Sequence, residues 1–240
     1  MELATRKNRP FVALRALRQL LADPDDLPNV FTIIDSLPGR APEYLLSQTK
    51  SSRSGAHLLA VKPQLAKQLC DREALRALPE GSLGRHYLEF VESQGISAEG
   101  IAEASELGGR RPENLPEDMR YLGDRLRDAH DLWHVVTGYG PDLVGEGALL
   151  AFTFAQTKNP GILAVVLLGL AKFDSAGRAD ILAGYRAGQR AAWLPAVEWE
   201  AWLARPLSEV RNELKVTQAH YQPVTSAELR SSGLLAAKPS

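Results

Sequence analysis

Two histidines and an acidic residue occur within five consecutive positions, as His130, Asp131 and His134. Because each residue of an α-helix advances by roughly 100°, these side chains would lie at about 0°, 100° and 40° around a helix. Imidazoles at positions i and i+4 can bind one metal ion from a single helix, and the carboxylate adds an anionic oxygen. The spacing favours a metal site, although such histidine pairs also occur as surface pairs or as capped core pairs.

Glu146 follows His134 after eleven intervening residues and would complete the ligand set. Two neutral imidazoles and two carboxylates neutralise a divalent cation and leave one or two coordination positions open, as catalytic sites do. Gly145 and Gly147 flank this glutamate. Each costs a helix about 1 kcal/mol relative to alanine, but each also allows two backbones to approach closely. We therefore expect His130, Asp131, His134 and Glu146 to form a catalytic metal site.

The sequence also restricts which metal or cofactor can act there. Cys70 is the only cysteine, so a thiolate metal cluster and an intrachain disulfide are excluded. No dinucleotide-binding GxGxxG motif, P-loop or second ExxH repeat occurs, so flavin, nucleotide and di-iron chemistry lack support. One divalent metal ion is predicted, either zinc or, for redox chemistry, iron, manganese or cobalt.

A helical hairpin would have to position these ligands. Pro116 suits the first position of a helix, and Gly138 suits its end. A second helix is expected from Asp142, a good capping residue, and would carry Glu146 in its first turns. Between Pro116 and Gly138 one apolar face recurs at helical spacing, through Met119, Leu122, Leu126, Ala129, Trp133 and Val136.

The rest of the chain predicts an all-α fold, because period-two alternation of β-branched and aromatic residues is absent from the sequence. Residues 1–220 are expected to form a single helical domain, and residues 221–240 a C-terminal tail. Further helices are predicted at 27–37 and 83–92. The Ser-rich stretch 41–57 is interpreted as a loop or partly ordered connection.

The first predicted helix ends near Asp23 and has Phe11, Leu14, Leu17, Leu20 and Leu21 at helical spacing. This pattern favours an amphipathic core helix over the alternatives of a transit peptide or a membrane-surface anchor. The longest apolar run, at 162–171, has ten residues. That is about half of the roughly 20 residues needed to span a bilayer, so a soluble or peripheral protein is expected.

Charge and isolated side chains add weaker indications. The formal net charge of −1 gives no electrostatic reason to expect a nucleic-acid partner. Arg127 could hold Asp131 from one turn earlier, or form an ordinary solvated pair. Tyr185 and Arg186 could contact a substrate carboxylate, or lie on a salt-bridged surface helix. The apolar segment 161–173 is typical of a core or dimer-interface helix, and the alternative is a groove for an apolar tail.

The metal motif resembles the HDxxH-x11-E signature of the coenzyme Q (ubiquinone) biosynthesis protein family numbered four in that pathway. Here it reads His130-Asp131-Leu132-Trp133-His134, followed by Glu146. The resemblance runs in the same order over roughly residues 11–216. It includes the stretches 23–25, 81–85, 121–122, 152–156, 199–200 and 205–207.

This resemblance implies a role in making ubiquinone, by removing the ring carboxylate of a polyprenylated 4-hydroxybenzoate intermediate and installing a hydroxyl. Its partners would be that polyprenylated aromatic precursor, other ubiquinone biosynthesis enzymes and a second copy in a homodimer. The protein would lie peripherally on the bacterial inner membrane, or on the matrix side of the mitochondrial inner membrane. One alternative is a non-catalytic organiser of the biosynthetic complex. Another, an HD-type phosphohydrolase, is disfavoured because Glu146 follows the motif so closely.

Overall fold

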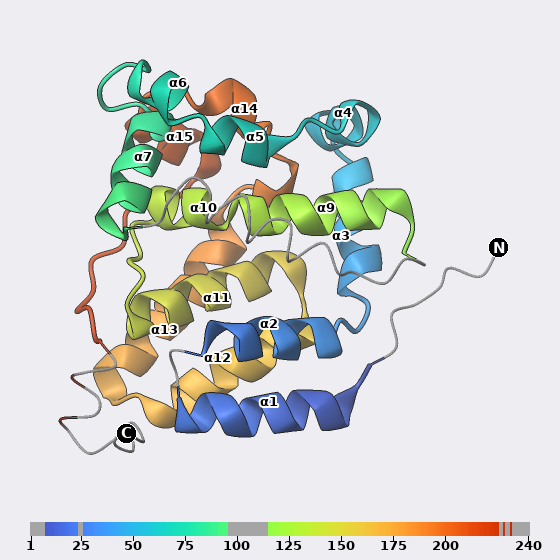
Figure 1. Cartoon of the computed structure of the whole chain (residues 1–240), viewed down its shortest axis with the longest axis vertical. Coiled ribbons are helices and arrows are strands. Elements are labelled where there is room, and N and C mark those ends of the chain that lie inside the picture. The colour runs from blue at the N-terminus through green and yellow to red at the C-terminus, as the bar shows by residue number, and fades with distance from the viewer. Residues whose placement is uncertain (1–7, 24–25, 96–114, 226–227, 229–230, 232–240) are drawn as a thin grey trace. The chain divides into compact units, whose positions relative to one another are not determined.

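The computed structural model describes residues 8–23, 26–95, 115–225, 228 and 231 (Figure 1). Within these ranges every regular element is a helix and no strand forms, which confirms the predicted all-α class. The helices are α1 (Pro10–Ala22), α2 (Leu27–Ser36), α3 (Ala41–Lys50), α4 (Arg53–Val61), α5 (Leu65–Cys70), α6 (Arg72–Arg76), α7 (Leu83–Ser93), α9 (Glu117–Asp128), α10 (His130–Thr137), α11 (Leu143–Thr157), α12 (Pro160–Lys172), α13 (Ser175–Arg190), the 3-10 turn η1 (Leu194–Ala196), α14 (Trp199–Trp202) and α15 (Leu207–Leu214).

These helices belong to two compact units, and each unit combines segments distant in sequence. The first unit contains residues 42–138 and 191–218, and the second contains residues 5–41, 139–190 and 219–240. In the first unit α10 packs against α7, α9 and α15. In the second unit α11 packs against both α12 and α13, and α2 packs against α1 and α12.

A buried ion pair joins α9 to α14 in the first unit. The two terminal nitrogens of Arg125 each donate to a different carboxylate oxygen of Glu200, both at 2.7 Å. Arg125 also donates to the Val197 carbonyl oxygen at 2.9 Å. The two charged side chains are only 3% and 11% exposed. Burial alone would lower the pKa of Arg125, but the hydrogen bonds and charge of Glu200 raise it, so the guanidinium stays charged.

Glycines set the close packing of α11 on α13 in the second unit. A Cβ added at Gly184 would lie 2.2 Å from the Ala148 carbonyl oxygen, and one at Gly188 would lie 2.5 Å from the Phe152 carbonyl oxygen. The side-chain amide of Gln156 donates to the Gly188 carbonyl oxygen at 2.7 Å. The two backbones therefore meet directly, and only glycine fits at these two positions.

Gly184→Ala is expected to destabilise the protein by about 1–3 kcal/mol, because the methyl group would push the two helix backbones apart. Urea unfolding followed by circular dichroism measures this change. Gly169→Ala is the matched control, since its Cβ would meet the flexible Ile181 side chain at 3.3 Å. The control should gain up to about 1 kcal/mol of helix propensity. Equal unfolding midpoints for the two variants would contradict this account of the α11–α13 contact.

The expected loop at 41–57 is wrong, because α3 and α4 occupy this stretch. Ser52 accepts a hydrogen bond from the Gly55 backbone N–H at 3.0 Å and so caps α4. A Cβ at Gly55 would lie 2.0 Å from the Thr49 carbonyl oxygen, so glycine is required where the chain turns between the two helices. Ser52 is thus a capping residue rather than a sign of a connecting loop.

The first predicted helix is confirmed, but only part of its predicted apolar face is buried, since Leu20 is buried and Leu17 packs beside it. α1 buries Ala13, Ala16 and Leu20. Phe11 and Leu14 are exposed instead, at 86% and 47%. Small alanine side chains let α1 lie close to α2, a preference that apolar periodicity does not reveal.

The apolar segment 161–173 forms most of α12 and packs on two apolar clusters, although its Leu167 is exposed. Ile162 and Val166 pack in one apolar cluster with Ile181. Ala164, Val165 and Leu168 pack against a second cluster that contains Ile33. α12 therefore contributes to both of these clusters. None of the described helices combines the length and apolar character that crossing a membrane requires.

Candidate metal centre

The helix that carries the two histidines begins at the first of them. One continuous helix was expected from Pro116 to Gly138, but Ala129, with ψ near −4°, separates α9 from α10. His130 is therefore the first residue of α10. Gly138 ends this helix with φ of 80°, as predicted, in a conformation that favours glycine.

The first unit brings three of the four predicted ligands together. The His130 and His134 rings have centroids 4.7 Å apart and planes at 75°. His130 Nδ1 lies 3.3 Å from Asp131 Oδ1. The two imidazoles thus lie side by side, as the i, i+4 spacing predicted, and Asp131 contacts the first of them.

Phe90 on α7 fixes the ring of His134. The two rings stack with centroids 5.3 Å apart and planes inclined by 19°. The imidazole is 1% exposed, which restricts it to few orientations. This contact was missed by the sequence analysis because α7 precedes the motif by about 40 residues, and an aromatic residue on a predicted helix shows no functional signal.

The surroundings of Asp131 keep its carboxyl group ionised. Burial would raise the pKa of this carboxyl, but the hydrogen bond from His130 and the charges of His130 and His134 lower it overall. Burial, with a contribution from the charge of Asp131, raises the pKa of Tyr87, so this phenol stays neutral at pH 7. The Asp131 carboxylate thus carries a negative charge beside His130.

Arg211 on α15 closes the other end of α10. Its side chain donates to the Val135 and Val136 carbonyl oxygens, both at 2.9 Å. Carbonyls in the last turn of a helix lack helical partners, and a cation there also interacts favourably with the helix dipole. Sequence reasoning could not find this contact because about 75 residues separate the partners.

Glu146 lies in the second unit, at the start of α11, where it is half-buried. Asp142 caps this helix, as predicted, by accepting from the Val144 and Gly145 backbone N–H groups at 3.1 Å. A Cβ at Gly145 would lie 2.3 Å from the Gly140 carbonyl oxygen, so the turn before α11 requires glycine there. The first turn of α11 is therefore held in a defined conformation.

The chain after residue 220 contributes to this helix start. Tyr221 donates to Asp142 and accepts from the Gly140 N–H at 2.7 Å. The Val224 N–H donates to Asp142 at 2.9 Å, and the Leu143 N–H donates back to the Val224 carbonyl oxygen at 3.0 Å. The predicted C-terminal tail begins at residue 221, and its residues Tyr221 and Val224 are bonded to the start of α11. Most of 226–240 lies outside the described residues.

The three side chains predicted less strongly to contact substrate lie on α9 and α13. Arg127 contacts Asp124 and Asp128, at 3.2 and 3.8 Å, in place of the expected contact with Asp131. Tyr185 on α13 stacks on Phe154 with centroids 6.0 Å apart. Arg186 is exposed on the same helix. Contact of these three side chains with a substrate stays a prediction.

Comparisons with known proteins agree on one family. A family model described as coenzyme Q (ubiquinone) biosynthesis protein Coq4 matches residues 5–220. The mitochondrial ubiquinone biosynthesis protein COQ4 homolog of Danio rerio is 27% identical over 193 residues, which cover 78% of this chain and 69% of that protein. The Talaromyces stipitatus protein coq4 is 30% identical over 170 residues, covering 69% and 57%. A solved structure of a candidate ubiquinone biosynthesis protein from Nostoc punctiforme has a TM-score of 0.60 and 25% identity, covering 87% and 98%.

Proposed function

This chain belongs to the Coq4 family of coenzyme Q (ubiquinone) biosynthesis proteins, and on that basis we propose that it uses one bound divalent metal ion in the pathway. The ligands would be His130, Asp131, His134 and Glu146. The reaction would remove the ring carboxylate of a polyprenylated 4-hydroxybenzoate-derived intermediate and install a hydroxyl at the same carbon.

The observation that carries this proposal is the arrangement at the start of α10. Two imidazole rings lie 4.7 Å apart there, and the neighbouring carboxyl group is kept ionised. His130, His134 and Glu146 are of the residue types that could hold a metal ion. Glu146 is supported by its sequence spacing and by the capped start of α11, which fixes the backbone of that turn.

The ligand set suits the proposed chemistry. Histidine and carboxylate ligands that leave coordination positions open let a divalent ion stabilise negative charge developing on a bound aromatic acid. The net change releases carbon dioxide and adds one oxygen atom to the ring. With dioxygen as the two-electron oxidant and one water consumed, hydrogen peroxide would be the other product. Zinc does not change oxidation state, so iron, manganese or cobalt fits if the metal takes part in electron transfer. With zinc, the ring and dioxygen would exchange electrons directly.

The protein's four proposed ligands have distinct tasks in this scheme. His134, held by Phe90, would fix the position of the ion relative to α7. His130 is more accessible, with a side chain 37% exposed. It would face the side from which substrate arrives. The negative charges of Asp131 and Glu146 would balance the ion and leave a neutral site for an anionic substrate.

Deletion of the corresponding gene should stop ubiquinone synthesis and cause a ring-carboxylated polyprenyl intermediate to accumulate, because the step after prenylation would be blocked. Mass spectrometry of lipid extracts measures both compounds. The host must contain no second decarboxylase for this step. Normal ubiquinone in such a deletion strain would refute the proposed role.

A non-catalytic organiser is the alternative within the same pathway, and metal replacement separates it from the enzyme. Purified protein loaded with zinc, iron, manganese or cobalt would be incubated with the carboxylated precursor and dioxygen. Turnover that depends on which metal is bound supports catalysis, whereas a bound ion without turnover supports an organising role. We also propose a homodimer, contact with other ubiquinone biosynthesis enzymes and peripheral membrane contact.

A further inference from the structure

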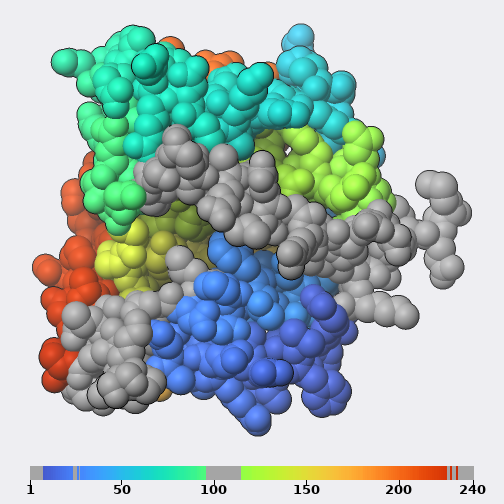
Figure 2. Space-filling model, viewed as in Figure 1, coloured from blue at the N-terminus to red at the C-terminus, as the bar shows by residue number. Residues whose placement is uncertain are grey.

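The outward face of α1 has a composition unusual for a solvent-exposed helix. Of the eight large apolar side chains exposed among the described residues, four lie on α1: Phe11, Val12, Leu14 and Leu21. The helix contains Arg15 and Arg18 but no acidic residue. Figure 2 shows the blue atoms of α1 and α2 at the surface. Scattered exposed apolar side chains are common, but a concentration of them on one helix indicates a binding surface.

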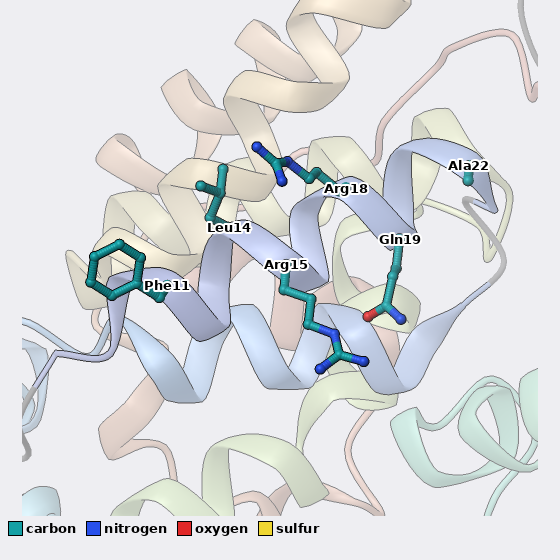
Figure 3. A pocket seen from close by; sticks show the side chains of 6 residues that line it. All are labelled: Phe11, Leu14, Arg15, Arg18, Gln19 and Ala22. Carbon is teal, nitrogen blue, oxygen red and sulfur yellow. The ribbon is translucent and has the colours of Figure 1, made fainter.

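The apolar and basic side chains of α1 share one face. Taking Phe11 as 0°, Leu14 lies at about 300°, Arg18 at about 340° and Arg15 at about 40° around the helix. An open hollow of about 400 Å³ is lined by α1 side chains (Figure 3): Phe11, Leu14, Arg15, Arg18, Gln19 and Ala22. A partner that binds this face of α1 would therefore contact both apolar side chains and positive charges.

We propose that this face of α1 docks on the surface of a membrane containing anionic phospholipids. Phe11 and Leu14 would enter the boundary between headgroups and acyl chains, as the apolar side chains of interfacial helices do. Arg15 and Arg18 have long aliphatic stems that lie along apolar surface while the guanidinium groups reach lipid phosphates. Exposed Arg9, just before the helix, adds a third positive charge.

A second copy of this chain fits the face less well than lipid does. In a two-fold dimer the same patch faces itself, so the arginines of one copy would meet those of the other. Like charges in close contact disfavour such an interface, and interface centres are generally depleted of charged residues. An anionic lipid surface complements both the apolar side chains and the positive charge.

This inference deepens the proposed peripheral location and rests on it, but its test needs neither metal nor substrate. The purified full-length protein would be floated with vesicles of phosphatidylcholine alone, or of phosphatidylcholine containing 30% phosphatidylglycerol, in a sucrose gradient. If the protein does not float with the vesicles, the docking proposal is refuted and the metal proposal is unaffected. Failure of the metal tests would likewise leave vesicle binding unchanged.

Two double variants separate the apolar and electrostatic contributions. Phe11→Gln with Leu14→Gln should weaken binding to both vesicle types by about tenfold or more, because two apolar side chains no longer enter the lipid. Arg15→Ala with Arg18→Ala should weaken binding about tenfold or more on anionic vesicles only, at roughly fivefold per arginine. It should also reduce the dependence of binding on salt, with Arg9 left to supply what remains.

Val61→Gln is the matched control, since Val61 on α4 is an exposed apolar residue outside α1. It should leave flotation unchanged. All substituted side chains are exposed, and circular dichroism checks that the helices persist. Wild-type levels of flotation in the Phe11/Leu14 variant would overturn the proposal. A second result would also overturn it: the wild type forms a dimer but binds no vesicles, and the Phe11/Leu14 variant is a monomer. The face would then join two copies of the chain.

Discussion

Replacing His134 by alanine should remove the metal and, with it, ubiquinone synthesis. The change deletes one of two imidazole ligands and leaves a site with one imidazole and two carboxylates. Changes in residues that only support a metal ligand weaken binding by about 10–100-fold, so loss of a ligand itself should exceed about 100-fold. Elemental analysis of protein purified without chelator measures the metal, and complementation of a deletion strain measures synthesis.

Two further variants distinguish loss of a metal ligand from loss of packing. His134 is buried against Phe90, so its removal also costs packing. His130→Ala removes the more exposed ligand and should give the same loss of metal with little change in thermal stability. Glu146→Gln keeps size and one oxygen but removes charge, so metal should bind more weakly without being lost.

The matched control is His86→Ala, which removes a partly exposed histidine on α7 that pairs with Glu89 at 3.3 Å. It should retain full metal content and full ubiquinone synthesis. If His134→Ala also retains full metal content and supports synthesis, the four residues do not bind a metal. The family resemblance would then explain only the fold.

The largest effect on stability is expected at Glu200. Glu200→Ala leaves Arg125 charged and buried, without the two hydrogen bonds it now makes to the carboxylate. Breaking a buried pair in this way typically costs about 3–5 kcal/mol of unfolding free energy, because the remaining charge is neither solvated nor paired. Urea unfolding of the purified protein measures the loss.

Nearby Glu198 provides a matched comparison. Its pair with His57 is exposed, at 33% and 57%, so Glu198→Ala should cost less than about 1 kcal/mol. The double variant Arg125→Met with Glu200→Leu removes both buried charges and should recover most of the stability lost by Glu200→Ala. Similar unfolding free energies for the two single alanine variants would show that the Arg125–Glu200 pair is not what holds α9 to α14.

The sequence predicted local features well because their signals are local. Asp142 as a helix cap, Gly138 as a helix end and the histidine pair at i, i+4 each depend on residues within one or two turns. Phe90 against His134 and Arg211 on the α10 carbonyls could not be predicted, since each contact joins residues 40 to 75 positions apart.

Two errors have a common physical origin. The outward face of α1 and the helices in 41–57 were both misjudged from side-chain composition alone. Packing of the small Ala13 and Ala16 brings α1 close to its neighbours, so the larger Phe11 and Leu14 are left outside. At 41–57, Ser52 satisfies backbone N–H groups at a helix start, so a polar stretch is helical. In both cases hydrogen bonding and backbone proximity outweighed hydrophobic patterning.

The second unit combines segments that are distant in sequence, so its packing cannot be completed until late in synthesis. Ile33 on α2 is buried in part by Val165 and Leu168 of α12, which are synthesised about 130 residues later. At about 5–20 residues per second, roughly 7–26 s pass between the synthesis of the two segments. The α1–α2 pair therefore exists for that time with an uncovered apolar surface. A chain released before α12 is made would retain this surface permanently and is expected to aggregate.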